Sequence, residues 1–115
     1  MEYEKLTGRG EAESSAVARS RVLAARELQT RRFAGSERLR VNADMGPAEV
    51  RRYCDVDSAA QPLLKAAAQR LQLSARAFHR VLKLARTIAD LAAAEVIAAP
   101  HIAEALQYRP RVDVG

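Results

Sequence analysis

The chain has 115 residues and a formal net charge of +5, and aromatic residues make up 4% of it. That length allows one small domain with a single hydrophobic core. Alanine dominates the apolar residues, which favours helices packed through small side chains and speaks against a sandwich, a barrel or a parallel sheet. Most of the cations are arginine, which permits a nucleotide, nucleic acid or acidic surface as partner without identifying one.

The sequence lacks the residues that several functional classes require. Cys54 is the only cysteine, and with His79 and His101 it has no zinc-ligand spacing, so we expect no metal site. No P-loop, dinucleotide-binding glycine motif or Ser/His/Asp set is present, so we expect no catalytic residue in this chain itself. No apolar run approaches the roughly 18 residues of a membrane span, and the N-terminus does not resemble a signal peptide. We therefore expect a cytoplasmic protein with no membrane partner.

The N-terminal third is predicted to form a loose segment and then a helix. Residues 1–13 carry charges and two glycines and are predicted to be a flexible lead-in. Apolar residues then recur at helical spacing over 16–33, and Gly35 is a candidate for the C-terminal cap. The helical domain is predicted to cover residues 14–109, and 110–115 to form a tail.

The middle of the chain predicts two further helices joined by connectors. Leu39 and Val41 alternate with polar residues, which allows a very short strand. Pro47 suits the first position of a short helix that ends near Tyr53.

Ser58 and Gln61 fit a capping box for a helix that reaches Leu71. In that register Pro62 would be about the fourth helical residue and would remove one early hydrogen bond.

The clearest helical pattern follows Ser74, which is predicted to cap a strongly amphipathic helix over 75–93. Its apolar stripe consists of Phe78, Val81, Leu82, Ala85, Ile88, Ala89 and Ala92. Arg76, Arg80, Lys83 and Thr87 recur on the opposite face, with His79, Arg86 and Asp90 beside them. A last helix is predicted from Pro100 to about Tyr108.

The segment Ser74-Ala75-Arg76 places a guanidinium at a helix N-terminus, where free backbone N–H groups and the helix dipole favour an anion. An arginine there is slightly unfavourable for the helix itself, which makes sense if it reaches an external phosphate. The alternative is an ordinary solvated basic face, because Arg80, Lys83 and Arg86 continue it.

Three stretches resemble the C-terminal domain of magnesium-chelatase-like AAA+ ATPases of the competence-protein (ComM/YifB) type. They are ESSAVARSRVLAARELQ (13–29), LSARAFHRVLKLARTIADL (73–91) and HIAEALQYR (101–109). The resemblance implies an all-α bundle of four to five helices that forms the lid of a ring-shaped ATP-driven motor, one that remodels DNA.

Arg76 matches the second-sensor arginine of such lids, so the resemblance implies contact with an ATP phosphate. ATP and its Mg²⁺ would be held mainly by a P-loop core absent from this chain, which should not hydrolyse ATP alone. Two other functions stay open: a basic DNA-binding domain that uses Arg80, Lys83 and Arg86, and a protein-interaction module.

Overall fold

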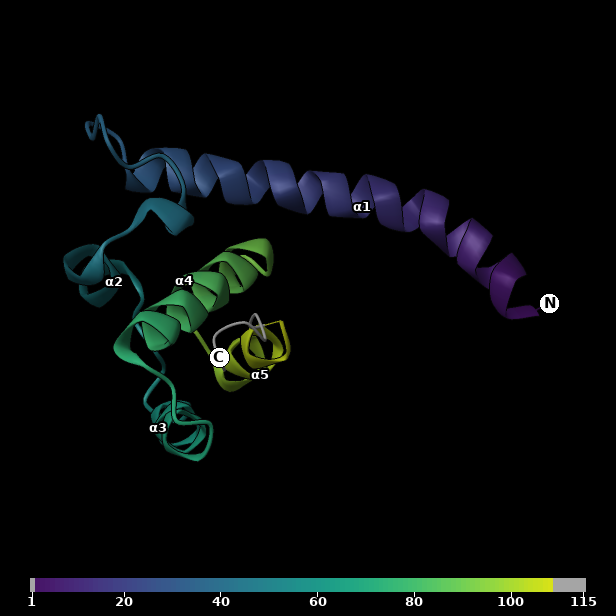
Figure 1. The fold of residues 1–115 in the computed structure, drawn as a ribbon. Coiled ribbons are helices and arrows are strands. Elements are labelled where there is room, and N and C mark those ends of the chain that lie inside the picture. Colours follow the sequence, from purple (N-terminus) through teal and green to yellow (C-terminus); the bar gives the residue numbers. More distant parts are fainter. Residues whose placement is uncertain (1, 109–115) are drawn as a thin grey trace.

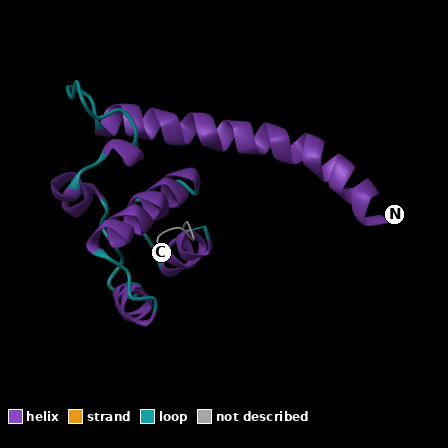
Figure 2. Cartoon of the chain, viewed as in Figure 1, coloured by secondary structure: helices purple, strands orange, loops and turns teal. Residues whose placement is uncertain are grey.

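Five α-helices and one short 3₁₀ helix follow one another in residues 2–108, the part of the chain that the computed structural model describes. They are α1 (Glu2–Arg32), the 3₁₀ helix η1 (Asn42–Asp44), α2 (Pro47–Tyr53), α3 (Gln61–Arg70), α4 (Ala75–Leu91) and α5 (Ala99–Gln107). The described residues contain no strand, only a single bridge between Val56 and Ile97, and Figure 2 shows the helical content. The all-α prediction is confirmed; the predicted tail, 110–115, lies outside the described residues.

Helix α4 lies at the centre, and α1, η1, α2 and α5 pack against it (Figure 1). Helix α5 makes the most extensive contact with α4, and α3 packs against α5. Helix α1 runs over the bundle at its C-terminal end, while its N-terminal part extends well beyond the bundle (Figure 1). Residues 15–24 of α1 are all exposed, whereas Ala25 and Gln29 are buried. Only the last turns of α1 are therefore anchored.

The helix starts follow local chemistry where the sequence carried a clear signal. Ser74 Oγ accepts a hydrogen bond from the Ala77 N–H at 3.0 Å, which confirms the predicted cap of α4. Pro47 is the first residue of α2, and Pro100 lies in the first turn of α5. Proline is tolerated there because its missing N–H would have no intrahelical acceptor.

Three predicted local features, the loose lead-in, a short strand and a capping box, differ from the structure. Helix α1 begins at Glu2, so the segment predicted to be a loose lead-in continues the helix. No strand forms at Leu39 and Val41, and the chain turns into η1 immediately afterwards.

Helix α3 begins at Gln61 after Ala60, not after Ser58, so the capping-box prediction is wrong. Pro62 is the second helical residue and removes no helical hydrogen bond, which is why the chain starts the helix there.

The core surrounds the apolar side of α4. Its buried members on that helix include Val81, Leu82, Ala85 and Ala89, as the amphipathic pattern predicted. Phe78 and Ile88 are only partly buried, and Ala92 is exposed because it lies at the end of the helix.

Two helices end in a left-handed residue that is not glycine. Gln72 after α3 has φ = 51° and Ala93 after α4 has φ = 56°. After α4, the Ala94 N–H bonds the carbonyl of Ala89 at 2.8 Å and the Ala93 N–H that of Asp90 at 3.0 Å. This is the Schellman arrangement, and it reverses the chain toward α5.

Candidate functional site

The exposed N-terminus of α4 carries the first candidate, Arg76. It is the second residue of the helix, its side chain is exposed, and no described residue forms an ion pair or hydrogen bond with it. The cap holds Ala77, and Phe78 N–H bonds the Ser74 carbonyl at 2.8 Å, so the first turn is well fixed. A guanidinium on a rigid helix start, beside N–H groups that favour anions, is suited to reach a phosphate from another part of a protein.

The other predicted basic residues of α4 do not share this freedom. Lys83 Nζ donates to the carbonyl oxygens of Ala43 and Met45, each at 3.3 Å, and so anchors the η1 turn to α4. Arg80 is partly buried. The proposed basic face is therefore narrower than its sequence spacing indicated.

Arg86 lies inside the bundle, which corrects its placement on the exposed face. Only 2% of the residue is exposed. Its Nη atoms donate to the backbone carbonyls of Tyr53 (3.4 Å), Glu95 (2.9 Å) and Ala94 (2.6 Å), and its Nε donates to Asp90 Oδ1 at 3.2 Å. The guanidinium therefore binds backbone carbonyls of the α4–α5 connector and of the end of α2, which have no helical N–H partner and attract a cation.

Asp90 is the centre of a buried polar cluster that we call the Asp90 hub: Gln29, Arg32, Asn42, Arg86 and Asp90. Arg32 donates to both carboxylate oxygens of Asp90, at 2.8 Å each, and also to Asn42 Oδ1 at 2.8 Å. Asn42 Nδ2 donates to Asp90 Oδ2 at 2.8 Å, while its backbone N–H donates to Gln29 Oε1 at 2.9 Å. No buried side-chain polar atom of the described residues lacks a partner, so the hub is fully satisfied.

The charges of the hub stabilise one another. Burial raises the pKa of Asp90, but the hydrogen bonds from Arg32 and Asn42 and the charges of both arginines outweigh it, so that the pKa lies below its usual value. The hydrogen bond to Asp90 likewise raises the pKa of Arg32. The carboxylate is therefore ionised at neutral pH.

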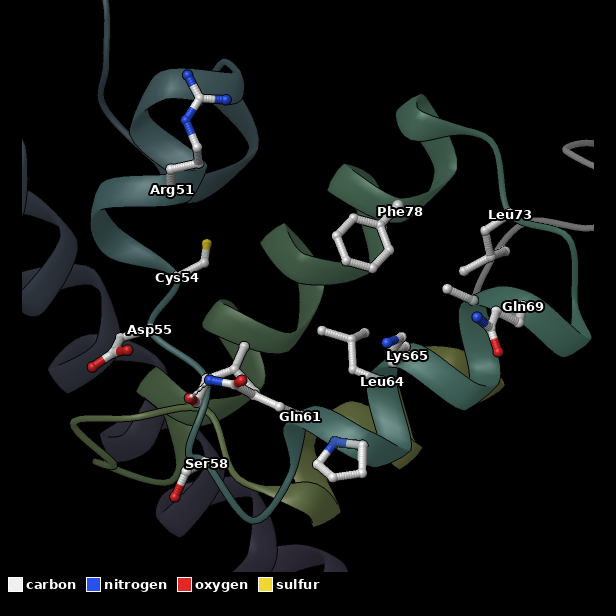
Figure 3. Close-up of a pocket in the computed structure, with 13 residues that line it drawn as sticks. Arg51, Cys54, Asp55, Ser58, Gln61, Leu64, Lys65, Gln69, Leu73 and Phe78 are labelled. Carbon is white, nitrogen blue, oxygen red and sulfur yellow. Dashed lines mark hydrogen bonds between the residues drawn. The ribbon is translucent and has the colours of Figure 1, made fainter.

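A groove of about 1030 Å³ lies between α2, α3 and the start of α4 (Figure 3). Phe78, Leu64 and Leu73 supply apolar walls, and Arg51 and Lys65 add charge at its edges. Phe78 is two residues after Arg76 and so leaves α4 on the opposite side, which separates the groove from the phosphate candidate. Cys54 also lines it as a buried thiol, and burial raises its pKa to about 11, so it is a poor nucleophile.

The sequence analysis missed Arg32, Asn42 and Gln29 as members of a site. Arg86 and Asp90 are spaced i,i+4, a pattern that normally indicates a surface pair. Arg32 lies 58 residues before Asp90, so no local spacing points to their contact.

The part of the chain that the structure describes contains neither a cluster of metal ligands nor a membrane-spanning helix. No three His, Cys, Asp or Glu side chains gather where they could hold a metal ion. No helix among the described residues is long and apolar enough to cross a bilayer.

Comparison with known proteins adds to this geometry. The family described as "Magnesium chelatase, subunit ChlI C-terminal" matches residues 12–109. The competence protein ComM of Haemophilus influenzae is 44% identical over 100 residues, which are 87% of this chain and 19% of that protein. The uncharacterized protein YifB of Escherichia coli K12 is 40% identical over 97 residues, 84% of this chain and 18% of the relative. The chain thus spans about a fifth of the length of these relatives.

Proposed function

Because the chain belongs to the magnesium chelatase ChlI C-terminal family, we propose that it acts as the lid of an AAA+ ATPase in which Arg76 senses the nucleotide. The observation that carries the proposal is the position of Arg76: exposed, at the rigid start of α4, and bound to no described residue. Its guanidinium contacts the γ-phosphate of ATP and loses that contact on hydrolysis, which changes how the lid sits on the motor.

Most of the nucleotide site belongs to a P-loop core outside this chain. That core holds the phosphates and Mg²⁺, and the exposed residues 15–24 of α1 provide a surface for it. The motor is a ring of identical subunits that remodels DNA, as the resemblance to the competence-protein group implies. The chain alone has no phosphate cradle, so it binds nucleotide with about millimolar affinity at best and does not turn it over.

A chimera tests the role of Arg76. This chain replaces the matching part of the Haemophilus competence protein, and ATP turnover is measured with and without DNA. Arg76→Ala should lower turnover by about 10- to 1,000-fold, the scale of losing one preorganised charge at a transition state. Arg76→Lys should restore only part of it, since a point charge does not reproduce the guanidinium fork.

Arg70→Ala is the matched control, because Arg70 is an exposed arginine at the end of α3 whose side chain forms no hydrogen bond or ion pair with the described residues. It should leave turnover close to that of the parent chimera. Parental turnover in Arg76→Ala, or an equal loss in both variants, would remove the sensor role.

A further inference from the structure

We propose that the Asp90 hub is a rigid joint that sets the angle of α1 relative to α4. This angular role concerns the chain itself and does not depend on the proposed nucleotide function. Arg32 and Asp90 act in it as positioning residues.

Helix α1 has a small footprint on the bundle. Ala25 and Gln29 are buried and Leu28 and Arg32 are partly buried, whereas residues 15–24 are exposed. Beneath that exposed stretch lies an open groove of about 710 Å³, bounded by Arg21 and Val22 on one side and by the end of α4 and the start of α5 on the other. Packing along the helix therefore does not fix its direction; the contacts near its C-terminal end must do so.

Within that footprint, the fork between Arg32 and Asp90 is the contact with the most strongly defined geometry. Arg32 Nη1 donates to Asp90 Oδ2 and Nη2 donates to Asp90 Oδ1, each at 2.8 Å, and a third bond of 2.8 Å goes from Nη1 to Asn42 Oδ1. Because the guanidinium group is planar, a bidentate pair of this kind resists rotation, which apolar contacts such as that of Ala25 do not.

The acceptor of the fork, Asp90, is itself held by further hydrogen bonds. Asp90 receives hydrogen bonds from Asn42 and Arg86, and Arg86 is tied to carbonyls at the end of α2 and in the α4–α5 connector. The Asp90 side chain thus links the direction of α1 to α2, α4 and the α4–α5 connector.

Buried ion pairs rarely stabilise a fold more than apolar residues of the same size would, because removing the charges from water is costly. What an apolar replacement would not supply is a defined angle. The hub lies at the opposite end of α4 from Arg76, 14 residues or about 21 Å away by helix rise. If Arg76 meets a nucleotide, α4 is the rod that connects that end to α1.

The test measures the angle directly in the isolated chain without nucleotide. Spin labels are placed at Arg19→Cys on α1 and Glu104→Cys on α5, both exposed positions, in a Cys54→Ala background. Position 19 lies about 20 Å from Arg32 along the helix, so a tilt of about 10° moves it by about 3.5 Å. Pulsed electron paramagnetic resonance resolves such a change in the distance distribution.

Arg32→Ala should broaden or shift the distance distribution by a few ångströms, while thermal unfolding stays cooperative. Arg32→Lys keeps the charge but not the fork, so it should give an intermediate width; it also decides the matter should Arg32→Ala not fold. Arg31→Ala is the control, because the side chain of the adjacent Arg31 is 70% exposed and, among the described residues, pairs with Glu27 alone, on its own helix. A parental distribution in Arg32→Ala, or in Arg32→Lys where only that variant folds, overturns the proposal, as does equal broadening in Arg31→Ala.

Discussion

Replacing Asp90 by asparagine tests how much of the stability of the domain depends on the hub. The substitution keeps the shape of the side chain and removes its charge. Arg32 and Arg86 then remain in the protein interior, with 14% and 3% of their side chains exposed, and without a counter-ion. Breaking a buried pair by neutralising one partner costs about 3–5 kcal/mol, and here one carboxylate serves two cations. Asp90→Asn should therefore fall in that range.

This cost is large for a small domain, because proteins of this size are stable by about 5–15 kcal/mol in total. Urea unfolding at pH 7, followed by circular dichroism at 222 nm, measures the loss as a lower midpoint at nearly constant slope. Glu27→Gln is the control, since Glu27 and Arg31 lie 3.7 Å apart on the surface and should contribute only about 0–0.5 kcal/mol. A loss below about 1 kcal/mol in Asp90→Asn would show that the hub is not the buried ionic centre described above.

Two further substitutions address the packing and the end of α4. Leu82→Ala should lower the free energy of unfolding in urea by about 2–5 kcal/mol, because Leu82 is buried in the core and the change leaves a cavity. An unchanged midpoint would show that the buried face of α4 has been assigned wrongly. Ala93→Gly should raise the free energy of unfolding by roughly 0.5–1 kcal/mol, because Ala93 has φ = 56° and glycine adopts that conformation without the penalty of a Cβ. A destabilised Ala93→Gly would mean that Cβ contacts of Ala93 outweigh its backbone strain.

The features that were predicted correctly depend on a few neighbouring residues. Ser74 caps α4 and Pro47 starts α2 because each interaction closes within one helical turn. The buried arc of α4 was predictable for the same reason, since a period of 3.6 residues places Val81 and Ala85 on one side whatever packs there.

Where two local signals competed, the sequence alone did not decide between them. Ser58 and Gln61 have the spacing of a capping box, but Pro62 is better tolerated in the first turn than at the fourth helical position, and the helix begins at Gln61. Leu39 and Val41 alternate like strand residues, yet no partner strand exists among the described residues to accept their backbone bonds.

The hub could not be predicted because its members are charged residues that only the fold brings together. Arg86 has the spacing of a solvated basic face, and whether it is buried depends on carbonyls supplied by two other segments. Asp90 is tolerated in the interior because Arg32, 58 residues earlier, meets it there together with Asn42 and Arg86. Periodicity records where a side chain points along its own helix and carries no information about such partners.

The protonation of Asp90 provides a final prediction, in which the sign follows from the direction of its shift. Its pKa in the folded chain lies below the value of about 3.9 that an unfolded chain gives, so the unfolded state takes up the proton first as the pH falls. The stability that Asp90 contributes is complete above that unfolded value and is lost as the pH falls through the folded one. The difference in unfolding free energy between wild type and Asp90→Asn should therefore be constant from pH 7 to about 5 and shrink below about 4. Comparing the two proteins at each pH removes the contribution of every other carboxylate, including Asp44, whose pKa is also lowered, by hydrogen bonds from the backbone of Arg40 and Val41. A difference that grows as the pH falls from 5 to 3 would mean that Asp90 is protonated more readily in the folded chain, and that its two arginines do not stabilise its charge.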